Sequence, residues 1–175
     1  MVYELPFGRG KKFLGQGGIV DAIVGGWEVS SLFIYQSGNT FTAQMNSNNS
    51  NSQANSQLPN VVPGVPLYPD NKTAAQWFNP AAFVAPGQYK FGNEGRNILR
   101  GPRYSDVDFS ASKTLRIPIP KVERGQIQFR FDATNALNHT SLGIPIASIG
   151  GSTVGQITGA ALSGSTLQLG ARLSF

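Results

Sequence analysis

The sequence predicts an all-β fold of antiparallel, up-and-down strands that forms the carboxy-terminal part of a transmembrane β-barrel and is incomplete on its own. Three observations support this prediction. The end of the chain alternates apolar and polar residues, three earlier stretches do so as well, and the connections between them alternate short and long. Successive side chains of a strand point to opposite faces, so such strands have one apolar and one polar face. Strands of outer-membrane barrels face lipid on one side and the lumen on the other.

The last ten residues, 166–175, carry the clearest alternation. The apolar set is Leu167, Leu169, Ala171, Leu173 and Phe175, and the polar set is Thr166, Gln168, Gly170, Arg172 and Ser174. The sequence then stops on an aromatic residue, which is unusual at the tip of a strand in a soluble domain. We therefore expect this stretch to be the final strand that crosses the membrane.

The remaining strands are predicted near residues 1–5, 27–44, 104–117 and 126–138. About ten residues at ~3.3 Å each, tilted by ~40°, span roughly 25 Å, which is the height of the apolar band of such a barrel. The one charge on an apolar face, Lys113, lies near the end of its strand, where its stem can extend to the lipid headgroups. Residues 19–24 are expected to form either one short helical turn or an apolar plug.

The connections divide into two classes by length. Residues 45–103 and 139–165 form long polar connections, which we expect outside the cell, and residues 7–26 and 118–125 form shorter ones. This arrangement would place Phe175 on the periplasmic side. Residues 46–57 are nearly pure Asn, Ser and Gln and are expected to be mobile and solvated. The aromatic segment 77–83 is expected to pack locally.

Composition excludes several classes of protein. Charged residues are 13% of the chain, about half the usual share, and 21 Gly and 11 Pro favour strands and turns over helices. The absence of Cys excludes disulfides. The net charge of +5 comes from a cluster at Arg9, Lys11 and Lys12 and from scattered residues, without the basic face of a nucleic-acid-binding protein. No apolar run is long enough for a membrane helix, and no export signal follows Met1, so we expect a fragment of an exported protein.

The sequence contains no recognisable catalytic or metal-binding constellation. His139 is the only His and there is no Cys, and Asp106 and Asp108 have no acid–base partner that spacing can identify. We therefore predict that the chain is not an enzyme and binds no metal or cofactor.

Polar-face charges and aromatic residues at strand ends are the other candidate site residues. The charges are expected to line the lumen, where they form cross-strand pairs as scaffold or, alternatively, contact a substrate. They are Asp106, Asp108, Arg116, Arg130, Asp132 and Arg172. The aromatic residues Trp27, Tyr35 and Tyr104 are expected at the membrane interfaces.

Several motifs, in this order, resemble the carboxy-terminal barrel strands of TonB-dependent outer-membrane receptors, especially the Oar-like group. They are Gly26-Trp-Glu-Val-Ser30, Tyr35-Gln-Ser-Gly-Asn-Thr-Phe-Thr42, Trp77-Phe-Asn-Pro-Ala-Ala-Phe83, Phe91-Gly-Asn-Glu-Gly-Arg-Asn-Ile-Leu-Arg-Gly-Pro102, Val107-Asp-Phe-Ser110, Phe129-Arg-Phe-Asp-Ala-Thr-Asn-Ala-Leu-Asn-His139 and Gly155-Gln-Ile-Thr158. The resemblance covers nearly the whole chain. It implies a location in the outer membrane and a parent protein that binds a ligand and imports it.

The resemblance also implies partners and an assembly signal. Gln168, Gly170, Leu173 and Phe175 match the terminal signal that the outer-membrane barrel assembly machinery recognises. Membrane lipid and the rest of the barrel with its plug are further implied partners. The plug and the segment that contacts TonB match no residue here, so TonB is implied only through parts that this chain lacks.

One alternative from a different class remains at this point. A soluble or surface-attached β-sandwich that serves as a binding or adhesion module would also show alternating strands. It would not predict the terminal Phe175 or the regular succession of short and long connections.

Overall fold

The computed structural model of the chain describes residues 1–8, 10–13, 18–53, 57–117 and 125–175. The chain divides into two compact units. The sheet unit consists of Met1–Ile34, Ser105–His139 and Gly164–Phe175, and the loop unit consists of Tyr35–Tyr104 and Thr140–Ser163. The predicted cluster residue Arg9 and the predicted turn residues 118–124 lie outside the described residues.

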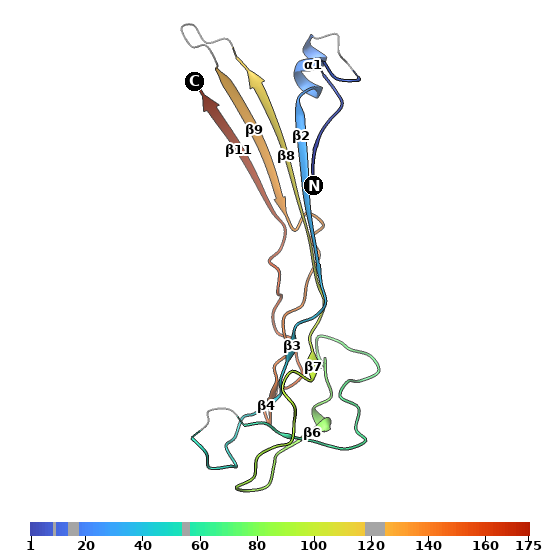
Figure 1. Cartoon of the computed structure of the whole chain (residues 1–175), viewed down its shortest axis with the longest axis vertical. Helices are drawn as coiled ribbons and strands as arrows, with labels where there is room; N and C mark the ends of the chain where they lie inside the picture. The colour runs from blue at the N-terminus through green and yellow to red at the C-terminus, as the bar shows by residue number, and fades with distance from the viewer. Residues whose placement is uncertain (9, 14–17, 54–56, 118–124) are drawn as a thin grey trace. The chain divides into compact units, whose positions relative to one another are not determined.

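The sheet unit contains one five-stranded sheet in the order β1-β2-β8-β9-β11 (Figure 1). The strands are β1 Val2–Glu4, β2 Trp27–Gln36, β8 Tyr104–Arg116, β9 Gln126–Thr134 and β11 Thr166–Ser174. The pairs β1–β2, β8–β9 and β9–β11 are antiparallel. The predicted all-β, antiparallel fold class is therefore confirmed, as is the expectation that these strands alone do not close a barrel.

Two predicted strands end earlier than the sequence suggested. β2 stops at Gln36, because Gly38 lies so close to the backbone of Gly101 that a Cβ there would be 1.8 Å from the Gly101 carbonyl oxygen. β9 stops at Thr134, because Asn135 and Asn138 both adopt left-handed backbone conformations with φ of 47°. Asn tolerates that conformation better than most residues, so the chain turns there instead of continuing the strand to residue 138.

The strand register places the apolar residues of three strands on one face. Phe131 lies between Ala111 of β8 and Leu169 of β11, and Phe129 lies between Lys113 and Ala171. The opposite face is polar, with Asp132 between Ser110 and Gln168. The side chain of Leu169 is 81% exposed, so no second layer of the described residues covers the apolar face at this strand. The alternation that the sequence showed is thus a property of the sheet as a whole.

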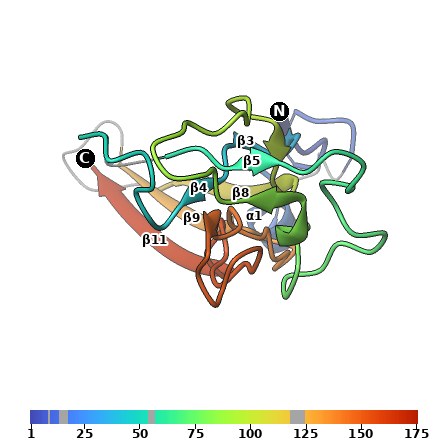
Figure 2. The same cartoon turned by 90° about the horizontal axis from the view of Figure 1, so that it is seen from below.

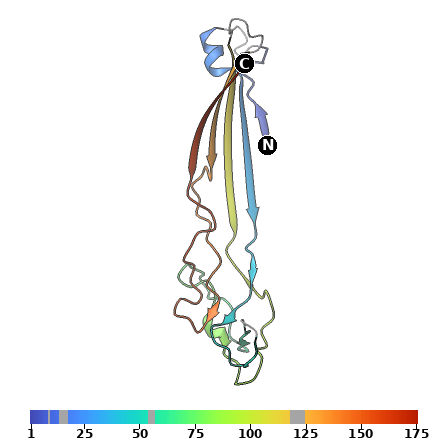
Figure 3. The ribbon, with the colours of Figure 1, turned by 90° about the vertical axis from the view of Figure 1, so that its left-hand side faces the viewer.

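Residues Ile19–Val24 form the short helix α1 beside the start of β2 (Figures 1 and 3). Of the two predicted alternatives, the helical turn is correct. Lys113 does not extend to the headgroups as predicted: it is buried, and its Nζ donates to the carbonyl oxygens of Ile23 (2.8 Å) and Gly25 (2.7 Å). Of the helices that the structure describes, none has the length and apolar character needed to span a membrane.

The loop unit is built from short strand pairs joined by irregular segments (Figure 2). β3 Thr40–Phe41 pairs with β7 Leu99–Arg100, and β5 Asn60–Val61 pairs with β6 Phe83–Val84, both antiparallel. β4 Gln44–Met45 pairs in parallel with β10 Ser148–Ile149, and the 3-10 helix η1 spans Pro80–Ala82.

A hydrophobic core stabilises the loop unit. Phe78 is fully buried and packs edge-on against Phe41 and Phe83, with ring centroids 5.8 Å apart in both pairs. The prediction that segment 77–83 packs locally is confirmed by Phe78 and Phe83, but the core also draws on Leu99 and Ile149 from distant parts of the chain. The two long connections are therefore parts of one folded unit.

The Asn/Ser/Gln run is anchored at its end, where Gln57 differs from the prediction of a solvated loop. Gln57 is buried, its backbone carbonyl accepts a hydrogen bond from the Met45 N–H (2.7 Å), and its Oε1 accepts one from the Asn49 N–H (2.7 Å). Its Nε2 donates to the Lys90 carbonyl (3.1 Å). An amide side chain can satisfy a buried backbone in this way, which the polar composition alone did not indicate. Residues 54–56 of the run lie outside the described residues.

Candidate functional site

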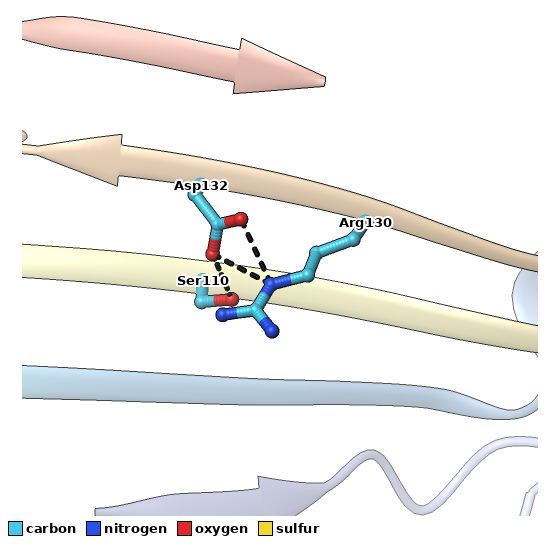
Figure 4. Close-up of polar contacts among 3 residues, drawn as sticks. All are labelled: Ser110, Arg130 and Asp132. Carbon is cyan, nitrogen blue, oxygen red and sulfur yellow. Dashed lines mark hydrogen bonds and ion pairs between the residues drawn. The ribbon is translucent and has the colours of Figure 1, made fainter. Parts of the chain in front are cut away.

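A cluster of three polar side chains marks the polar face of the sheet (Figure 4). Asp132 of β9 accepts a hydrogen bond at Oδ1 from Ser110 Oγ of β8 (2.6 Å). Arg130 precedes Asp132 by two residues, so both side chains lie on the same face, and Arg130 Nε lies 2.9 Å from Oδ1 and 2.8 Å from Oδ2. The strand period and the β8–β9 register together create this cluster.

The ion pair contributes little to stability but fixes the guanidinium. The Arg130 side chain is 61% exposed, and exposed pairs of this kind are worth about 0–1 kcal/mol. Asp132 occupies the Nε side of the guanidinium, which leaves the two terminal nitrogens as donors. The arrangement presents an oriented cation to whatever occupies the space above this face.

The cluster lines a hollow of about 570 Å³ on the polar face. Ser30 of β2, Asp108 of β8 and Gln168 of β11 contribute to the same lining. The hollow thus offers hydrogen-bond donors and acceptors from four neighbouring strands. It is larger than two other hollows on the sheet, of about 430 Å³ and 340 Å³.

The other predicted lumenal charges do not converge on this hollow as a charged group. Asp108 accepts a hydrogen bond from the Asn135 N–H (3.1 Å) and so holds the turn after β9. Asp106 is buried. Arg116 lines a second hollow of about 430 Å³, and Arg172 of β11 lies opposite Gln128. Arg130 and Asp132, two of the predicted charges, form an ion pair within a single strand, whereas the sequence analysis expected pairs between strands.

The sequence analysis did not predict that two residues, Glu4 and Lys11, meet at the second hollow. Lys11 forms an ion pair with Glu4, and both line the hollow that Arg116 borders. The segment before Lys11 suggests only a basic turn. Its proximity to Glu4 depends on the path of the connection between β1 and β2, which the sequence does not define.

The sequence analysis also did not predict the buried carboxyl group of Glu94 in the loop unit. Glu94 is 4% exposed, and its Oε1 accepts a hydrogen bond from the Ala43 N–H (3.0 Å). Its Oε2 is buried and has no hydrogen-bond partner among the described residues. Burial raises the pKa of Glu94 from its usual 4.5 to about 7, although the Ala43 N–H lowers it in part. Glu94 lies in a segment without periodicity, so no sequence pattern marked it.

The comparisons with known proteins identify the family. The model of the outer membrane β-barrel domain matches residues 1–169. The chain belongs to the outer-membrane β-barrel domain family. No curated protein and no solved structure matches the chain.

Membership of the outer-membrane β-barrel family assigns an environment to each face of the sheet. The protein is located in the outer membrane. In barrels of this family we therefore expect the apolar face, with Phe129, Phe131 and Leu169, to contact lipid, and the polar face, with the Ser110–Arg130–Asp132 cluster, to line the lumen. The predicted location is therefore confirmed. The soluble-sandwich alternative is not supported, because it would require a second layer over the apolar face.

The predicted assembly-signal residues lie at the edge of this barrel segment. Gln168 and Gly170 face the polar side opposite Asp132 and Arg130, whereas Leu173 lies on the apolar face opposite Ile127. Phe175 follows the end of β11 and is 85% exposed. β11 is the last strand of the described sheet, with β9 as its neighbour, so its other edge is open to a further strand.

The predicted interface aromatics all lie at strand ends. Trp27 is the first residue of β2, Tyr104 is the first residue of β8, and Tyr35 is the penultimate residue of β2. Trp27 is half-buried and donates from Nε1 to the Ile23 carbonyl (3.0 Å). Their assignment to the lipid–water boundary remains a prediction.

Proposed function

We propose that the chain is the carboxy-terminal barrel segment of a TonB-dependent receptor of the Oar-like group, whose parent protein binds a ligand and imports it across the outer membrane. The observation that carries this proposal is the folded loop unit. Two long connections share one buried core around Phe78, as expected of a receptor that must present a defined surface. The motif resemblance through residues 26–158 supports the same assignment.

The orientation in this proposal follows the connection lengths. The loop unit lies outside the cell, and the end of the sheet that carries Phe175 lies on the periplasmic side. The hollow at Arg130 and Asp132 then faces the ligand path, with the terminal guanidinium nitrogens as donors to an anionic or carbonyl group. The chain has no catalytic role and no cofactor in this proposal.

The proposed partners follow from the open edge and the lipid-facing surface. The barrel assembly machinery recognises β11 through Gln168, Gly170, Leu173 and Phe175. The rest of the barrel pairs with the open edge, its plug fills the lumen, and TonB engages the parent through segments outside this chain. Membrane lipid covers the apolar face.

The test of import uses the parent gene and TonB together. Cells with and without the parent gene, each with TonB intact or disrupted, are grown in a complex medium, and depletion of medium components is measured by mass spectrometry. We expect at least one component whose uptake requires both genes. Uptake that needs the parent but is unaffected by the loss of TonB would contradict the TonB-dependent mechanism. An unchanged depletion profile in cells without the parent would contradict a role in import.

A further inference from the structure

The helix α1 has its apolar side chains outward and its charged side chain inward. Ile19, Val20 and Ile23 are 81%, 56% and 65% exposed. The Asp21 carboxylate lies against the backbone on both sides of α1: a Cβ at Gly25, which follows the helix, would be 2.6 Å from Asp21 Oδ1, and one at Gly8, in the preceding connection, would be 2.9 Å from it. A surface helix in water has the opposite arrangement, with polar residues outward. The orientation of α1 therefore fits an apolar surrounding.

Lys113 fixes α1 to the lipid-facing side of the sheet. The register places Lys113 on the apolar face, opposite Phe129. Its buried ammonium donates to the carbonyl oxygens of Ile23 (2.8 Å) and Gly25 (2.7 Å), which are among the carbonyl groups that a helix leaves unpaired at its carboxyl end. A cation in this position is also favoured by the helix dipole. The charge is thereby satisfied on a face where an unpaired charge would be costly.

Trp27 reinforces the same attachment. Its Nε1 donates to the Ile23 carbonyl (3.0 Å), and its ring centroid lies 5.5 Å from Lys113 Nζ. Trp side chains combine an apolar ring with one donor and are common where a membrane protein meets the headgroup region. Two side chains of the sheet thus hold a single carbonyl of α1.

The exposed side of α1 adjoins the surface that contacts lipid. Trp27, which binds α1, also lines an apolar hollow of about 340 Å³ on the sheet, together with Phe129, Phe131, Leu169 and Ala171. The family assignment gives this face to lipid. The helix therefore lies beside this surface at the end of the strands (Figure 3).

We propose that α1 is an interfacial anchor that lies in the glycerophospholipid leaflet at this end of the sheet, with Ile19, Val20 and Ile23 among the acyl chains and Lys113 as its fastening to the barrel. Short helices with one apolar side bind at the boundary between headgroups and acyl chains. The choice of leaflet rests on the periplasmic orientation in the proposed function, but the contact of α1 with lipid does not depend on whether the parent protein imports a ligand.

The test measures the lipid exposure of α1 in the parent protein. The chain contains no Cys, so Ile23→Cys places a single label in it once any cysteines of the parent outside this chain are replaced by Ser. The variant is labelled with an environment-sensitive fluorophore and reconstituted in phosphatidylcholine vesicles with or without nitroxide-labelled phosphatidylcholine. Thr114→Cys, next to Lys113 but on the polar face, is the negative control, and Leu169→Cys, on the apolar face, is the positive control.

We expect nitroxide lipid to quench the label at position 23 about as strongly as at position 169 and several-fold more strongly than at position 114. Aqueous iodide should quench position 114 more strongly than position 23. Equal iodide quenching at positions 23 and 114, without quenching by nitroxide lipid at position 23, would overturn the proposal.

A second variant tests whether Lys113 attaches α1 to the barrel. Lys113→Met keeps the apolar stem and removes the ammonium, so the label at position 23 should become more accessible to iodide, while Lys12→Met, in the exposed connection, should leave it unchanged. An unaltered label in Lys113→Met would overturn the role of Lys113. If Lys113→Met does not reach the membrane as a folded barrel, the comparison of positions 23, 114 and 169 still tests whether α1 lies in lipid.

Discussion

Arg130 is held by Asp132 on one side of its guanidinium, and the two terminal nitrogens are left as donors on the polar face of the sheet. If the terminal nitrogens contact the ligand, Arg130→Gln removes a charge-assisted contact worth about 1.5–3 kcal/mol, or about 10- to 100-fold in affinity. We expect weaker ligand binding by the parent with an unchanged amount of folded barrel. Arg172→Gln is the matched control, because Arg172 also lies on the polar face, opposite Gln128. An equal loss of binding in both variants would indicate a general charge effect instead of a site at Arg130.

Glu94 makes the loop unit sensitive to pH. Its pKa is about 7 in the folded unit, against an ordinary value of 4.5, so between these values the folded unit keeps a proton that the unfolded chain has lost. Stability therefore falls as pH rises from about 4.5 to about 7, by about 3 kcal/mol at most, and is level outside that range.

Glu94→Gln should remove this pH dependence, because a neutral amide can still accept the Ala43 N–H at its oxygen. We expect the variant to be more stable than the natural sequence at pH 8 and similar at pH 4. The measurement is hydrogen exchange of peptides that cover residues 39–46 and 92–100, corrected for the intrinsic rate at each pH. Asp70→Asn, which removes an exposed carboxylate of the same unit, should leave the dependence intact. Loss of the pH dependence in Asp70→Asn as well would contradict the role of Glu94.

At the scale of elements, the sequence predicts the long strands because alternation, register and burial act together on them. β8, β9 and β11 begin at the predicted residues, and β8 and β11 end within one residue of the predicted ends. The helix–plug ambiguity at residues 19–24 and the ends of β2 and β9 depended on tertiary contacts instead. The bend after β2 comes from the approach of Gly38 to Gly101, and the carbonyls of α1 are bound by Lys113, which is 90 residues away from Ile23.

The bend after β2 requires a glycine for lack of space. A Cβ at Gly38 would lie 1.8 Å from the Gly101 carbonyl oxygen and 2.5 Å from that of Pro102, and backbone atoms cannot move aside cheaply. Gly38→Ala should therefore destabilise the loop unit by about 1–3 kcal/mol, as other overpacked substitutions do. We expect faster cleavage of the loop unit by added protease on intact cells. Gly159→Ala, where a Cβ would meet nothing within 4 Å, should be cleaved at the natural rate. Equal rates for both variants would contradict the steric argument.

The next prediction concerns the role of the end of β11 in assembly of the barrel. Phe175 is highly exposed after the end of an edge strand, so it contributes little to packing within the described sheet. Deleting Phe175 from the parent should lower the amount of folded barrel in the outer membrane several-fold, and Phe175→Tyr should preserve it by keeping an aromatic terminus. The measurement is the heat-modifiable band in the outer-membrane fraction. Undiminished folded barrel after the deletion would show that Phe175 is not part of the assembly signal.

At the scale of the whole molecule, the two units differ in how far sequence reasoning reaches. The sheet unit follows a period-2 pattern that lipid and lumen impose on every strand, so its faces can be assigned residue by residue. The loop unit has no such pattern. Its core joins Phe41, Phe78 and Ile149 from segments far apart in sequence, and buried Gln57 and Glu94 belong to it despite their polarity. The candidate site could be predicted only in part. The strand period places Arg130 and Asp132 on one face, whereas the contact between Glu4 and Lys11 is set by a connection of irregular path.

The assignment of the two faces gives the last prediction. Leu169 and Gln168 are neighbours in the middle of β11, with Leu169 on the apolar face and Gln168 opposite Asp132 on the polar face. An Arg on the lipid face near the midplane costs about 2–4 kcal/mol. Leu169→Arg should therefore lower the unfolding free energy of the parent barrel in lipid by about that amount. Gln168→Arg, which adds the same charge facing the lumen beside Asp132, should change it by less than about 1 kcal/mol. Urea unfolding in lipid vesicles, followed by gel shift, measures both. Equal costs for the two variants would mean that the faces are not divided between lipid and lumen as the register indicates.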